Sequence, residues 1–313
     1  MNKKPIAVVL LTALCFSVTQ NVSVAIETNT EPFLVDIVLS RNQVFPYEPV
    51  AVLLRLKNVT TVDQILRSTF GALLLFGTQE KGPWQGYGTP APQPASIPPW
   101  QATFRPGETM NTVQYIDITF DNDHAFSTPG TYWIKGRFAD RESNPIKVEV
   151  IQPTSTDVGA IEVLRKNRIY KYFSQSSVQI LLEQMGEADP SPEITAFIAQ
   201  YPSSRYAQWA KLALLLIKRQ QAVSMAVLKD DVTGLRAIQK ELAQLGPSLL
   251  PSISAECWFA AGVTSVMCGD ATLAQNAFSK AAATGGSAIM SEQVALSLKG
   301  LSVSNPSAAG SGP

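Results

Sequence analysis

The hydrophobic pattern of this sequence changes its period once, at about residue 152, and this change constrains the fold more than any other feature. Between Phe33 and Ile151, apolar residues recur at every second position in short segments separated by proline and glycine, a pattern typical of strands. From about residue 153 onward, the apolar spacing becomes three and four residues, which indicates amphipathic helices. The sequence therefore predicts a multidomain β + α protein, with strands first and helices second.

The N-terminal segment has the layout of a secretory signal peptide. Lys3 and Lys4 precede an apolar run from Ile6 to Val18, and small residues lie at the first and third places before the bond after Ala25. This order is typical of a cleaved signal, and the run is too short to span a membrane. We therefore expect removal of residues 1–25 and an exported protein, periplasmic or secreted, without a membrane span. Retention of the segment as an uncleaved anchor is the alternative.

Five segments of the first half are predicted to be strands, because each is short, alternates in polarity or is strongly apolar, and is bounded by turn residues. They are Phe33–Leu39, Val50–Lys57, Val113–Phe120, Thr131–Phe138 and Ile146–Ile151. Several short strands with such turn signals favour a β-sandwich.

The turn motifs before these strands carry a resemblance. They are Tyr47–Val50, Arg105–Glu108, Pro129–Ile134 and Ser143–Ile146. In them the sequence resembles the immunoglobulin-like modules of bacterial exported proteins, and the motif Gly-x-Tyr-x-Ile at residues 130–134 is similar to the tyrosine-corner strand of such modules. Ile134 stands where antibody domains carry a cysteine. The resemblance implies an immunoglobulin-like β-sandwich at residues 26–152.

A proline-rich segment between Gly77 and Gly107 interrupts the strands and contains Trp84, Tyr87 and Trp100. So long a loop is either functional or a loosely ordered excursion. One hypothesis makes the three aromatic side chains a platform that stacks on a glycan or a peptide, because Trp and Tyr offer large flat faces at low entropic cost. The simpler hypothesis is that Trp84 and Trp100 pack the segment against the sheet, since aromatic residues near sheets are most often packing residues.

One helical hairpin of the second half carries a specific motif. Trp258-x2-Ala261-Gly262 is followed by Ala274-x3-Phe278-x2-Ala281, which resembles the Trp-x2-Leu-Gly and Ala-x3-Phe pattern of a tetratricopeptide repeat. Gly262 and Ala274 are expected to let two antiparallel helices approach closely, with Trp258 and Phe278 filling the surrounding space. We expect an all-α, tetratricopeptide-like solenoid of three or four helical hairpins at residues 153–301 and a disordered tail at 302–313.

Two cysteines follow the signal segment, Cys257 and Cys268, and an oxidising compartment favours a disulfide. On one continuous helix they would lie roughly 16 Å apart, too far to bond. A disulfide is therefore expected only if the helix between them is broken.

Composition excludes several function classes. Lys and Arg total 25 and Asp and Glu total 25, so the chain lacks the basic excess of a nucleic-acid-binding protein. With one histidine, His124, and three cysteines, a conventional zinc site or a Ser-His-Asp or Cys-His enzyme is hard to assemble. Asp121-Asn122-Asp123-His124 lacks the spacing of a calcium loop and is interpreted as a polar turn.

We therefore predict no metal, no cofactor and no catalytic residue. The leading hypothesis is a non-enzymatic exported protein that binds another envelope or extracellular protein through its helical-repeat surface. One alternative is a glycan- or cell-wall-binding protein that uses Trp84, Tyr87 and Trp100. The other is a hydrolase with a pair of carboxylates in one cleft, for which the sequence identifies no pair.

Overall fold

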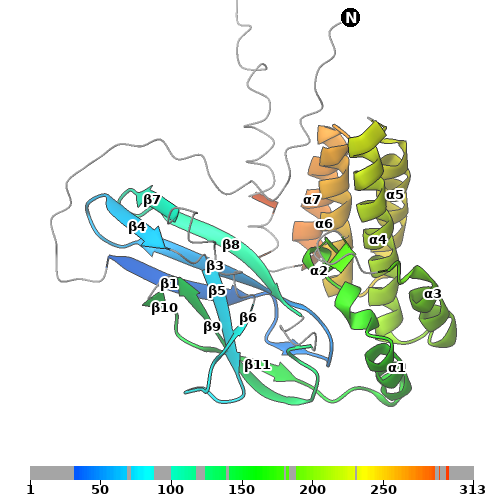
Figure 1. Cartoon of the computed structure of the whole chain (residues 1–313), viewed down its shortest axis with the longest axis horizontal. Helices are drawn as coiled ribbons and strands as arrows, with labels where there is room; N and C mark the ends of the chain where they lie inside the picture. Colours follow the sequence, from blue (N-terminus) through cyan, green and yellow to red (C-terminus); the bar gives the residue numbers. More distant parts are fainter. Residues whose placement is uncertain are drawn as a thin grey trace, which may run out of the picture. The chain divides into compact units, whose positions relative to one another are not determined.

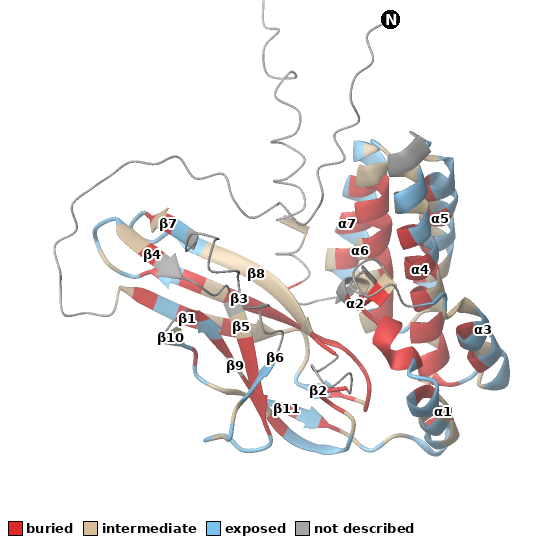
Figure 2. Cartoon of the chain, in the orientation of Figure 1, coloured by how far each residue is buried: buried red, intermediate tan, exposed pale blue. Residues whose placement is uncertain are grey.

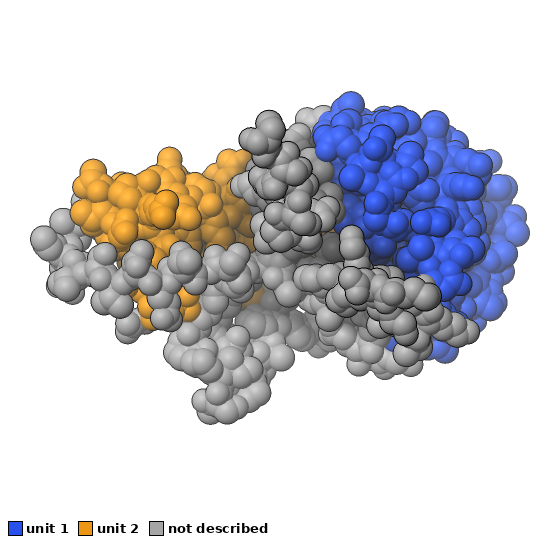
Figure 3. All heavy atoms as spheres, turned by 90° about the horizontal axis from the view of Figure 1, so that it is seen from above, with its two compact units in different colours: residues 1–15, 153–313 blue, residues 16–152 orange. Residues whose placement is uncertain are grey.

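The computed structural model describes residues 32–68, 72–87, 100–117, 124–138, 141–179, 181–182, 188–229, 231–285, 289 and 294–295. The predicted signal peptide and C-terminal tail lie outside these residues, as do positions 88–99 of the proline-rich segment. The chain divides into two compact units between Gln152 and Pro153 (Figure 3). We call the described residues before this boundary the strand unit and those after it the helical unit.

The strand unit contains eleven described strands in three sheets (Figure 1). Their bounds are β1 Phe33–Leu39, β2 Gln43–Val44, β3 Val50–Asn58, β4 Gln64–Ser68, β5 Ala72–Gly77, β6 Gln85–Tyr87, β7 Trp100–Phe104, β8 Thr109–Ile116, β9 Gly130–Phe138, β10 Arg141–Glu142 and β11 Ile146–Val150. One sheet has the order β1-β3-β8, and a second has the order β2-β11-β9-β5-β6 with β10 paired to β9. β4 and β7 form a two-stranded sheet. Only β2 and β11 pair in parallel among the described strands.

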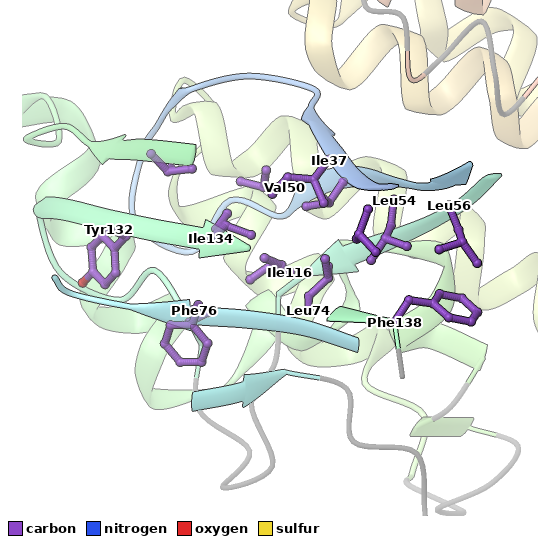
Figure 4. Close-up of a cluster of buried hydrophobic side chains, with 14 of the residues drawn as sticks. Ile37, Val50, Leu54, Leu56, Leu74, Phe76, Ile116, Tyr132, Ile134 and Phe138 are labelled. Atoms are coloured by element: carbon purple, nitrogen blue, oxygen red, sulfur yellow. The ribbon is translucent and has the colours of Figure 1, made fainter. Parts of the chain in front are cut away.

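One hydrophobic core joins the two larger sheets. Ile37, Leu54 and Ile116 come from the first sheet, and Leu74 and Ile134 come from the second (Figure 4). The alternation along β9 explains this arrangement, since its even-numbered residues from Tyr132 to Phe138 are buried and its odd-numbered residues face outward.

Gly136 marks the closest approach between the two sheets. A Cβ atom at this position would lie 2.6 Å from Ile37 Cγ2 and 2.7 Å from Leu54 Cδ1. The core therefore has no room for a side chain here, and a glycine is required at this point of β9.

The helical unit is built of helices throughout its described part. Their bounds are α1 Ser155–Lys166, η2 Ile169–Tyr172, α2 Gln175–Gln179, α3 Ser191–Gln200, α4 Arg205–Lys229, α5 Thr233–Leu245, η4 Gly246–Ser248, α6 Pro251–Met267 and α7 Ala271–Gly285. Tyr206, Trp209, Leu212 and Leu216 follow helical spacing and predict a long helix that begins near residue 202, and α4 contains all four residues. No described helix has both the length and the apolar character that crossing a bilayer requires.

α4 and α6 form the interior of this unit. α4 packs against α2, α3, α5 and α6, and α6 packs against α4, α5 and α7. Figure 2 shows α6 buried over most of its length. Because α6 is continuous from Pro251 to Met267, Cys257 and Cys268 are not bridged, and both are free thiols.

Candidate functional site

The outer face of β9 carries aromatic and basic side chains. Trp133, Lys135 and Arg137 occupy its odd-numbered positions, opposite in direction to the core residues Ile134 and Phe138. In the sheet, Trp133 lies between two cross-strand neighbours, Lys147 of β11 and Gly77 of β5.

Trp84 covers the same face of the sheet. A Cβ atom at Gly77 would lie 3.6 Å from Trp84 Cε3, so the indole ring lies beside the cross-strand neighbour of Trp133. Lys135 Nζ lies 4.5 Å from the centroid of the Trp84 ring, within the range of a cation–π interaction. Trp84 remains partly exposed. It therefore combines packing against the sheet with an accessible aromatic surface.

Glu142 forms ion pairs with two basic side chains of this face. Its carboxylate forms ion pairs with Lys135 and with Arg137, whose Nη2 lies 3.1 Å from Glu142 Oε1. Lys135 is thereby held over Trp84, since one ammonium group contacts both the carboxylate and the ring.

The three aromatic residues predicted from the sequence are described to different extents. The backbone of Tyr87 pairs with Leu74, and that of Trp100 pairs with Ser68, but both side chains lie outside the described part of the structure. The structure instead places Trp133 on the same outer face of the sheet as Trp84. The signal for Trp133 was present in the sequence, since Trp133, Lys135 and Arg137 occupy every second position of one strand.

A shallow cleft continues the outer face toward the start of β9. Its volume is about 330 Å³. It is lined by Pro129, Gly130, Thr131, Glu149, Val150, Ile151 and Gln152. Thr131 and Glu149 are cross-strand neighbours and lie one outward-facing position beyond Trp133 and Lys147 along their strands. The cleft and the aromatic face are therefore continuous.

The motif residues of the helical hairpin meet at the contact between α6 and α7. A Cβ atom at Gly262 would lie 2.5 Å from Phe278 Cδ1, so the Phe278 ring packs directly on the α6 backbone. Ala274 and Ala281 are fully buried on α7. Trp258 is 8% exposed and lies under Lys280, whose Nζ is 4.2 Å from the ring centroid. These motif residues therefore pack α6 against α7.

A buried cation lies where α4 meets α2. Arg219 is only 6% exposed, and its Nη1 donates a hydrogen bond of 2.8 Å to Gln175 Oε1. Arg219 Nε and Gln175 Nε2 are buried donors without an acceptor, and within the described part of the chain no carboxylate pairs with the guanidinium. Desolvation lowers the pKa of Arg219 to about 10, so the group is charged at neutral pH. Lys211, Lys218, Arg219 and Lys229 place positive charge along this helix, a pattern that predicts a solvated face. The burial of Arg219 shows that this prediction is wrong for that residue.

The single histidine is buried in the strand unit. His124 is 3% exposed, and its Nδ1 accepts a hydrogen bond of 3.1 Å from the Phe126 amide. Burial lowers the pKa of His124 to about 3. The imidazole is therefore neutral and enclosed at neutral pH, which is unsuited to proton exchange with a substrate in solvent. Asp121–Asp123 lie outside the described residues, among which no cluster of three or more His, Cys, Asp or Glu side chains could hold a metal ion.

Comparisons with known proteins give no family. No family model matches the sequence, and no curated protein matches it. The solved structures that are similar have low TM-scores, and two of them cover less than half of this chain. A β-glucosidase from Listeria innocua has a TM-score of 0.26 at 12% identity, covering 38% of this chain and 16% of its own. The sporulation control protein Spo0M from Bacillus subtilis has a TM-score of 0.25 at 15% identity, covering 43% of this chain and 56% of its own.

Proposed function

We propose that the chain is an exported, non-enzymatic binding protein in which an immunoglobulin-like sandwich carries a tetratricopeptide-like stack that docks another envelope or extracellular protein. Export is supported by the signal-peptide layout of residues 1–25. Docking of a protein partner is the usual role of stacked helical hairpins.

The immunoglobulin-like assignment is supported by Tyr132. Its hydroxyl donates a hydrogen bond of 3.0 Å to the Thr128 carbonyl, four residues upstream. Tyr132 also precedes the core residue Ile134 by two positions on β9. A tyrosine that closes a corner in this way, two residues before the position of the second cysteine, is a feature of immunoglobulin-like sandwiches.

The tetratricopeptide-like assignment is supported by the order in which helices pack. α2, α4 and α6 contact one another in sequence, while α3 packs against α4, α5 packs against α4 and α6, and α7 packs against α6. This order fits two stacked hairpins, α4–α5 and α6–α7, with α2 and α3 both packed against α4 before them.

The observation that carries the docking proposal is the unfilled acceptor position between α2 and α4. A buried guanidinium with a neutral partner is costly, because its charge is desolvated and no carboxylate among the described residues opposes it. A partner that inserts an acidic side chain between these two helices would supply the missing acceptor for Arg219 and Gln175.

The test compares Arg219→Met with Lys218→Met in the full-length protein. Lys218 is the adjacent residue, is exposed and pairs with Glu241, so the control removes a neighbouring charge without touching the buried group. Tagged proteins are crosslinked in cells of the source organism, and captured proteins are identified and quantified. We expect wild type and Lys218→Met to capture the same partner and Arg219→Met to capture it about tenfold less, as for a central hot-spot residue.

Hydrogen exchange of α4 distinguishes lost docking from lost folding in Arg219→Met. Equal capture by Arg219→Met and wild type would show that the guanidinium does not contact the partner. Capture of no protein by the wild type would count against docking itself.

A further inference from the structure

We propose that the outer face of β9 and β11 is a binding site for an acidic polysaccharide, with Trp133 stacking on a sugar ring and Lys147 pairing with an acidic group of the chain. This site lies in the strand unit. It goes beyond the protein docking proposed for the helical unit and does not depend on it.

Trp133 and Lys147 are accessible side chains of this face that have no interaction partner among the described residues. They are direct cross-strand neighbours in the pairing of β9 with β11. Trp133 is partly exposed and Lys147 is exposed, and neither side chain forms a hydrogen bond, ion pair or ring contact within the described part of the structure. The indole presents both a flat apolar surface and an N–H donor, a combination suited to a sugar ring with its hydroxyl groups.

The basic groups around Trp133 favour an acidic ligand over a neutral one. Lys135 and Arg137 share a single carboxylate, that of Glu142. Glu149 accepts a hydrogen bond of 3.2 Å from Gln43 Nε2, and no described residue forms an ion pair with Lys147. The outer face therefore holds more cations than carboxylates, and the unpaired cation lies next to the exposed indole.

The face is elongated, which suits a polymer. The cleft at Thr131 and Glu149, then Trp133 with Lys147, and then Lys135 with Trp84 follow one another along β9. From Thr131 to Lys135 the strand extends about 13 Å at its usual rise per residue. Trp84 is packed under Lys135 and provides a second aromatic surface at the far end of this track.

The test measures binding of the full-length protein to three polymers. These are polygalacturonate as the acidic polysaccharide, dextran as a neutral polysaccharide and poly-glutamate as an acidic polypeptide. We expect polygalacturonate to bind at least about tenfold more tightly than either of the others, because only this polymer offers both sugar rings and carboxylates. We also expect its affinity to fall as the salt concentration rises.

Variants locate the site. Trp133→Ala is expected to weaken binding to polygalacturonate about tenfold, and Trp133→Phe, which keeps a stacking ring and preserves the strand, about threefold. Lys147→Glu is expected to weaken it about tenfold by placing a carboxylate opposite the ligand. Lys57→Ala is the control, because Lys57 is exposed on β3 of the other large sheet, and it should leave the affinity unchanged.

Three results would overturn the proposal. The wild type could fail to bind polygalacturonate, or it could bind poly-glutamate or dextran equally well. Lys147→Glu could also bind polygalacturonate as tightly as wild type does.

Discussion

Three buried ionisable groups, two in the strand unit and one in the helical unit, differ in how their charge is compensated. In the strand unit, Glu48 is fully buried, but Arg41 Nη1 lies 3.0 Å from its carboxylate and the Phe45 amide donates to the same oxygen. His124 is also buried there and is neutral, because desolvation lowers its pKa to about 3. In the helical unit, Arg219 stays charged and has a neutral partner, Gln175. Glu48 and His124 are thus compensated or neutralised, and Asp157 of the helical unit accepts hydrogen bonds from Ser204 and Arg205. Arg219 differs from these groups because it retains a desolvated charge with a neutral partner.

This difference helps to distinguish charges that stabilise the fold from charges that are retained for another role. A charge that is paired within its own unit is explained by folding alone, whereas a buried charge without an opposite charge needs another explanation. Three measurements test the contrast, each by hydrogen exchange because it reports the opening free energy of each unit separately within the full-length protein.

The largest expected effect is the acid sensitivity of the strand unit. The pKa of His124 is about 3 in the folded protein, where burial lowers it from the ordinary value of 6.5 for an exposed imidazole. The unfolded chain therefore binds a proton below pH 6.5 that the folded chain does not bind. The stabilisation is complete above pH 6.5 and is lost as the pH falls toward 3. Between pH 6.5 and pH 4 we expect a loss of about 3 kcal/mol from this group, measured on β9 amides after correction for the intrinsic exchange rate.

His124→Asn is the matched variant, because asparagine does not titrate in this range and its side-chain oxygen can still accept a hydrogen bond from the Phe126 amide. Its loss of stability over the same interval should be smaller than that of wild type by about 3 kcal/mol. Identical pH dependence in the two proteins would contradict the neutral, buried state of His124.

The next effect is the loss of stability when the buried carboxylate of Glu48 is removed. Glu48→Ala leaves Arg41 Nη1 and the Phe45 amide without their acceptor, and we expect the strand unit to lose about 3 kcal/mol. Asp36→Ala is the control, because Asp36 pairs with Arg55 at 3.5 Å on a face where both side chains are substantially exposed. Loss of this exposed pair should change stability by less than about 1 kcal/mol. Equal losses in the two variants would show that burial does not strengthen the Glu48 contacts.

The sequence predicted the positions of helices and strands better than it predicted which side chains contact one another and which stay accessible. Alternation located β3 and β9, and helical spacing located α4 and α6, because burial of one face dictates those periods. Side-chain partners depend on contacts between distant segments. The sequence contains no local sign that Trp84 and Trp133 share one face of the sheet, because the register that pairs Gly77 of β5 with Trp133 of β9 places them there.

The burial of Arg219 could have been anticipated in part. Consecutive residues of an α-helix point about 100° apart, so Lys218 and Arg219 cannot share one face of α4. The structure assigns Lys218 to an exposed pair with Glu241 and Arg219 to the contact with α2. Sequence spacing could separate the two residues, but the identity of the buried one depends on which neighbouring helix packs there.

The smallest expected effect is a gain in stability of the helical unit. It tests directly whether the buried charge of Arg219 destabilises that unit. Replacement of Arg219 by Met and Gln175 by Leu removes the desolvated charge together with its neutral partner, and both new side chains are apolar and of similar size. We expect the opening free energy of α4 to rise by about 1–2 kcal/mol, as when buried ionic groups are replaced by packed hydrophobic residues. Lys218→Met should change it by less than about 0.5 kcal/mol. A large loss of stability in the double variant would mean that the guanidinium supports the fold. A gain, together with loss of the captured partner in Arg219→Met, would mean that the charge is retained for binding.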